Sequence, residues 1–177
     1  MVLYYGRRAI YFPMMASKGN MHELRIVGIA LAGSDGSPLV VFQDTETGDF
    51  LPLPTDPFDA EIVIREFTGD GDGTAVGWLV DAIGRNTPRG AVVETDADGP
   101  PKIRFSFGWG MKGLTTRVLP LGEGLGLCRR LDLPVSVDAG VFESFSRELD
   151  YLRTRHAFRR NFLYLTPPQY APTIPVE

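Results

Sequence analysis

The stretch LPLPTDPFDAEIVI, residues 51–64, is the most informative part of the sequence for the fold, because a strand ends in it and a helix begins. Its first residues are apolar and read as the end of a strand. Asp56 then suits the N-cap position of a helix, and Pro57 suits its first turn. Asp59 and Glu61 follow where carboxylates meet free N–H groups and the positive end of the helix dipole. We therefore predict a strand-to-helix junction at Asp56.

The segments on either side of this junction follow the same logic. Upstream, HELRIVGIAL alternates like a strand, and PLVVFQDTETGDFLPL reads as a strand, a turn at ETGD and another strand. Downstream, Phe58, Ile62 and Phe67 are expected to line one face of the helix, which the GDGDG at 69–73 ends. Thr74 could cap a second helix that Gly84 closes. The first half is therefore predicted as a β-meander followed by two helices.

The second half repeats this plan. Three β-like runs, 91–95, 102–108 and 114–119, precede a Gly-rich helix through EGLGLCRRL and a small strand, LPVSV. We expect an α+β fold with a mixed or antiparallel sheet and flanking helices, and two strand-strand-strand-helix repeats are a plausible interpretation. GVFESFSRELDYLRTRHAFRRNF, residues 140–162, predicts a C-terminal helix, and LTPPQYAPTIPVE is a Pro-rich tail.

Composition favours one domain in a reducing, cytoplasmic setting. The 177 residues are 44% apolar, and the single cysteine, Cys128, has apolar neighbours and is expected to be a buried core residue. The N-terminal AIYFPMMA is too short for a signal-peptide core or a membrane span. We expect residues 1–20 to be a disordered extension, residues 21–143 the domain, and residues 144–177 the C-terminal helix and tail.

The charge distribution does not by itself suggest nucleic acid as a partner. Residues 21–142 carry 10 Lys and Arg against 18 Asp and Glu, a net charge of −8. An acidic body repels a polyphosphate unless a basic strip or a bound metal overrides its field.

The order of these motifs resembles the bacterial bifunctional nuclease family, once a domain of unknown function. The resemblance covers about residues 23–143 and is carried by VGIAL, PLVVFQDTETGDFLPL, DPFDAEIVI, the helix ending at Gly84 and the helix leading into LDLPVSVDAGVFE. It implies an α+β fold, a dimer, and hydrolysis of RNA or DNA.

The family's polar blocks are only partly kept. In the first, Glu61 fits and Asp59 keeps the acid of the family's first Glu. In the second, Ala75 and Val76 replace a His-Asp pair. In the third, Glu123 stands at the family's Asp position and Arg130 at its last Arg, while an Arg-Pro-Ser run has become Pro-Leu-Gly.

Two hypotheses on function therefore stay open. In the first, the chain is a nuclease in which Asp59, Glu61 and Glu123 are catalytic, together with Asp56 around a divalent ion such as Mg²⁺ or Mn²⁺. In the second, the chain is a non-catalytic binding or assembly module on the same fold. Capping alone explains Asp56 and Asp59, so the carboxylates do not decide between the two.

The remaining candidates are weaker on sequence grounds. His22 and His156 are expected to be surface residues, because neither lies in a matching motif. GDGDGT resembles the start of a calcium loop but has Ala75 where the turn needs Gly, so a flexible acidic turn is the better interpretation. Basic residues in the C-terminal segment could bind nucleic acid together with Arg130, or could form a solvated helix face; they are Arg147, Arg153, Arg155, Arg159 and Arg160.

Overall fold

The first half of the chain forms an antiparallel meander, as its alternating pattern predicts. The computed structural model describes residues 21–32, 36–72, 74–84, 86–96, 99–108, 114–145 and 162–165. Strand β1 (Met21–Ala32) pairs with β2 (Ser37–Asp44), which pairs with β3 (Phe50–Pro54). Prolines at 52 and 54 remove backbone donors from β3, which suits its position at the edge of the sheet.

The second half forms a second meander, and a short strand joins the two into one sheet. Strands β4 (Gly90–Glu94), β5 (Lys102–Gly108) and β6 (Leu114–Pro120) are antiparallel neighbours. Strand β7 (Val135–Asp138) pairs antiparallel with β1 and parallel with β4. The sheet order is β3-β2-β1-β7-β4-β5-β6, which confirms an α+β fold with a mixed sheet.

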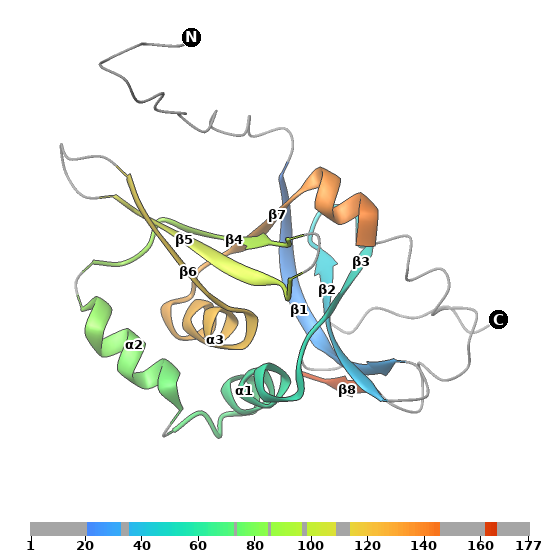
Figure 1. The fold of residues 1–177 in the computed structure, drawn as a ribbon, viewed down its shortest axis with the longest axis horizontal. Helices are drawn as coiled ribbons and strands as arrows, with labels where there is room; N and C mark the ends of the chain where they lie inside the picture. The colour runs from blue at the N-terminus through green and yellow to red at the C-terminus, as the bar shows by residue number, and fades with distance from the viewer. Residues whose placement is uncertain are drawn as a thin grey trace, which may run out of the picture.

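Three helices lie together below the second meander (Figure 1). Helix α3 (Leu121–Leu131) lies between α1 (Pro57–Thr68) and α2 (Ala75–Ile83), and it also contacts β5 and β6. The main hydrophobic core fills the space between these helices and the sheet. Its largest fully buried side chains include Phe42, Leu51, Leu53, Ile103, Phe105 and Leu125.

The glycines of α3 lower its intrinsic helix propensity, but they also allow it to pack closely against its neighbours. A Cβ at Gly122 would lie 2.6 Å from the backbone oxygen of Asp59, and one at Gly126 would lie 2.8 Å from the Val76 side chain. Both distances are below normal van der Waals contact. Close approach of α3 to α1 and α2 therefore requires glycine and compensates for the low helix propensity.

One expectation about the helices is wrong in detail. Phe58 does not line the core, because its side chain is 69% exposed. The buried stripe of α1 instead includes Asp59, Ile62, Val63 and Glu66, so it begins one residue later and carries two acids. Ile62 and Phe67 do lie against the core as expected, Ile62 buried and Phe67 partly buried.

The C-terminal helix pattern is confirmed only at its start. Residues 139–145 are helical, but Phe162 belongs to strand β8 (Phe162–Tyr164), which pairs with β1. A helix through residue 162 is therefore wrong at its end, since β8 adds a strand to the sheet. The predicted extension at residues 1–20 and most of the predicted C-terminal helix lie outside the described residues.

Candidate functional site

The N-terminus of α1 is capped as the sequence predicts. Oδ1 of Asp56 accepts hydrogen bonds from the backbone amides of Phe58, at 2.8 Å, and Asp59, at 2.9 Å. Pro57 occupies the first turn, where no donor is needed. The Asp56 carboxylate is therefore used in holding its own helix.

The carboxylate of Asp59 caps a second helix. Asp59 is only 5% exposed, and its Oδ1 accepts a hydrogen bond of 3.0 Å from the backbone amide of Gly122, in the first turn of α3. The residue at the N-cap of α3 is Pro120, whose side chain makes no capping bond. Asp59 therefore supplies, from α1, the acceptor that α3 lacks.

The pKa of Asp59 is raised above its ordinary value. Burial is the largest cause, and the negative charges of Asp56 and Glu123 act in the same direction. The hydrogen bond from the Gly122 amide lowers it, but by less. Three carboxylates thus act on one another where α1 and α3 begin.

The predicted acidic set is only partly brought together there. Glu123 is half-buried in the first turn of α3 and is close enough to raise the pKa of Asp59. Glu61 is exposed on α1. Among the described residues, no three His, Cys, Asp or Glu side chains are arranged to hold a metal ion. The triad of Asp59, Glu61 and Glu123 does not converge on one metal-binding arrangement.

Arg130 makes an ion pair with the buried Glu66 that the sequence did not reveal. Its Nε donates to Oε2 of Glu66 at 2.7 Å, and its Nη2 donates to Oε1 of Glu66 at 3.0 Å and to the backbone oxygen of Gly71 at 2.6 Å. The Thr74 hydroxyl also donates to Glu66. The hydrogen bond to Glu66 is the largest cause that raises the pKa of Arg130. The guanidinium therefore ties α3 to α1 and to the loop before α2.

Thr74 and Glu66, the other side chains of this cluster, have roles that the sequence analysis did not assign to them. Thr74 precedes α2 as predicted, but its hydroxyl makes no capping bond and instead reaches Glu66 and the Gly71 oxygen. Glu66 could have been noticed in the sequence, because it lies four residues after Ile62 and seven after Asp59 on one face of α1. An acid on a core-facing stripe needs a buried partner.

His22 has partners, contrary to the expectation of an isolated surface residue. Its Nδ1 lies in hydrogen-bonding contact with Oδ2 of Asp44, which is 1% exposed, and its ring stacks on Phe142 with centroids 4.4 Å apart. Burial alone would raise the pKa of Asp44, but the amides of Glu46 and Thr47 and the His22 ring hold it below its ordinary value. This dyad joins the start of β1 to the end of β2.

The other predicted residues fall into two groups. Cys128 is buried in the core as expected, at 4% exposure. Arg153, Arg155, Arg159 and Arg160, predicted as nucleic-acid contacts, lie outside the described residues, as do Arg147 and His156.

Helix α2 exposes an aromatic side chain that sequence reasoning did not single out. Trp78 is 80% exposed, and Val76 is the one residue of α2 that is buried. A large aromatic in water is typical of a contact surface, because aromatics are enriched at protein interfaces.

Comparison with known proteins gives no assignment. No family model matches the chain, and no curated protein matches it. Among the described residues, no helix has the length and apolar character to cross a membrane.

Proposed function

We propose that the chain is a bifunctional-nuclease-like domain that serves as a binding and assembly module rather than as a nuclease. The observation that carries this proposal is the use of two family-matched polar residues in internal bonds. The Asp59 carboxylate is committed to the Gly122 amide, and the Arg130 guanidinium is committed to Glu66. Oδ1 of Asp59 and the Nε and Nη2 donors of Arg130 are therefore used in contacts that hold α3 in place.

The surface that supports assembly is α2. Seven of its nine residues, AVGWLVDAI, are apolar, Trp78 is exposed, and Asp81 is its one charged residue. The apolar side chains of Leu79, Val80 and Ile83 are only partly buried against the core. Homodimer interfaces resemble a domain core cut in half, with aromatics enriched and charges depleted. We therefore assign α2 as the contact with a second copy of this chain.

Light scattering coupled to size-exclusion chromatography tests this assignment. Wild-type protein is expected to elute as a dimer, and Trp78→Ala is expected to shift the equilibrium toward monomer by removing an anchor from the interface. Phe58→Ala is the matched control, because it removes another exposed aromatic, at 69% exposure, from α1. A monomeric wild type, or a Trp78→Ala dimer as tight as wild type, contradicts the assignment of α2.

A second candidate function is metal-assisted cleavage of RNA or DNA. It is favoured by the mutual repulsion of Asp56, Asp59 and Glu123, which a Mg²⁺ or Mn²⁺ ion would relieve. On this hypothesis Glu61 completes the acidic set, and the Arg residues of the C-terminal segment guide the substrate.

A cleavage assay separates the two functions. RNA, single-stranded DNA and duplex DNA are incubated with the protein in Mg²⁺, in Mn²⁺ and in chelator. Our proposal expects no metal-dependent cleavage by wild type and no difference between wild type and Glu61→Gln. Turnover that chelator abolishes and that Glu61→Gln lacks would instead establish the nuclease.

A further inference from the structure

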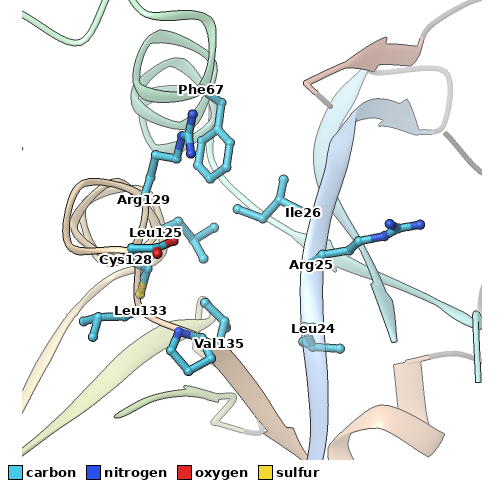
Figure 2. A pocket seen from close by; sticks show the side chains of 11 residues that line it. Leu24, Arg25, Ile26, Phe67, Leu125, Cys128, Arg129, Leu133 and Val135 are labelled. Carbon is cyan, nitrogen blue, oxygen red and sulfur yellow. The ribbon is translucent and has the colours of Figure 1, made fainter. Parts of the chain in front are cut away.

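A pocket of about 160 Å³ lies between the helices and the joint of β1 with β7. Figure 2 shows Ile26 on the β1 side and Leu125, Cys128 and Arg129 on the α3 side, with Val135 below. Phe67, from the last turn of α1, lies beside Arg129 at the upper end of the view. The pocket thus lies where two helices and two strands meet, away from the Asp59 carboxylate.

Most of the residues that line this pocket have apolar side chains. Leu24, Ile26 and Val135 are 5%, 8% and 6% exposed, so this part of the lining is made of largely buried apolar side chains. Cys128 is 4% exposed, and burial raises the pKa of its thiol to about 12, so this wall is a neutral thiol. Arg25 contributes no cation, because its side chain points to the other side of β1, where its Nε donates to Gln43 at 3.0 Å.

Arg129 supplies a positive charge at this apolar pocket. Its guanidinium carbon lies 5.8 Å from the centroid of the Phe67 ring, and no carboxylate within the described residues bonds it. The next residue, Arg130, differs because Glu66 neutralises it. Asp132, at the end of α3, also lines the pocket and disfavours an anion on its own side. A cation held over an aromatic ring at an apolar pocket is suited to an acid with an apolar tail.

We propose that this pocket binds a small aliphatic carboxylic acid, with its tail between β1 and α3 and its carboxylate on the Arg129 guanidinium. A dry protein cavity of about 150 Å³ accommodates benzene, so a tail of about five or six carbon atoms matches the volume here. The guanidinium can bond both oxygens of a carboxylate in one plane, which a neutral alcohol cannot reproduce. This binding is independent of the proposed assembly through α2.

The probes are hexanoate, hexan-1-ol and acetate. Binding of each is monitored by amide chemical-shift changes in two-dimensional NMR spectra of the full-length protein. Hexanoate is expected to bind with a dissociation constant on the order of 1 mM, because it has few atoms. Its shift changes should be saturable and should cluster at Ile26, Phe67, Cys128 and Val135. Hexan-1-ol lacks the charge and acetate lacks the tail, so each should bind at least about tenfold more weakly.

Arg129→Gln is expected to weaken hexanoate binding by at least about tenfold while leaving hexan-1-ol binding unchanged. Arg117→Gln is the matched control, since Arg117 is an exposed arginine of β6 that lies outside the pocket lining. Equal affinity for hexanoate and hexan-1-ol, unchanged hexanoate binding by Arg129→Gln, or shifts located elsewhere would each overturn the proposal. Loss of folding in Arg129→Gln would be visible in the same spectra, and Arg129→Lys, which keeps the charge, should then retain hexanoate binding in preference to hexan-1-ol.

Discussion

Replacing Arg130 by alanine is expected to destabilise the protein far more than replacing its neighbour Arg129. The side chain of Glu66 is 2% exposed and that of Arg130 is 28% exposed, so Arg130→Ala would leave a buried carboxylate without its cation. Removing one partner of a buried pair costs about 3 to 5 kcal/mol. Because Arg130 is partly exposed, we expect the lower end, about 3 kcal/mol.

Arg129→Ala is a close control for this prediction. Both arginines are in the last turn of α3, so both interact with the negative end of the same helix dipole. Within the described part of the chain, the contact of Arg129 is with the Phe67 ring, and the expected loss is about 1 kcal/mol or less. The free energy of unfolding is measured by urea denaturation at neutral pH. Equal losses for the two variants, both below about 1 kcal/mol, would refute the structural role assigned to Arg130.

The remaining predictions concern three other buried groups. Asp59→Asn keeps an acceptor for the Gly122 amide and removes the buried charge, so its stability at pH 7 should equal or exceed wild type, whereas Asp59→Ala should lose about 1 kcal/mol in urea denaturation. Because the pKa of Asp59 is raised in the folded protein, the contribution of Asp59 to wild-type stability should fall as pH rises from the unfolded pKa of about 3.9 through the folded pKa. Asp59→Asn should lack this pH-dependent component. If wild type and Asp59→Asn have the same dependence of stability on pH, the prediction is contradicted. His22→Ala removes one of the contacts that lower the pKa of Asp44, whose contribution is present above about pH 3.9 and lost as pH falls through the folded pKa. The pH midpoint of acid unfolding of His22→Ala, followed by circular dichroism, should therefore be higher than that of wild type. An unshifted midpoint would disprove that His22 lowers the pKa of Asp44. Cys128 should react with a thiol reagent at pH 8 only after unfolding, since its thiol is buried with a pKa of about 12; rapid native-state labelling would show otherwise.

Local chemistry in the sequence accounts for much of the fold. Asp56 and Pro57 mark the start of α1, Gly84 marks the end of α2, and the alternating runs mark the strands. These features act over a few residues, so a single sequence contains them. The predicted burial of Phe58 was wrong because packing against α3 determines which face of α1 is buried. That face begins at the next residue, so the Phe58 side chain points into solvent.

The candidate site depends on contacts that local patterns do not contain. Arg130 is 64 residues from Glu66, and His22 is 22 residues from Asp44. Strand β8 was hidden because its three residues, FLY, are too few for an alternating pattern. From the sequence, the glycines of α3 indicate only a low helix propensity. The short distances from a Cβ at Gly122 to Asp59, and from a Cβ at Gly126 to Val76, show why glycine is needed there.

Binding of Mn²⁺, followed by paramagnetic broadening of backbone amides, tests the role of the Asp59 carboxylate. The claim is that the Asp59 carboxylate is used as a helix cap and not as a metal ligand. We expect no saturable broadening at residues 56–61 and 121–124, and the same response from wild type and Asp59→Asn. Saturable broadening of both segments in wild type, lost in Asp59→Asn, would contradict the claim and favour the nuclease.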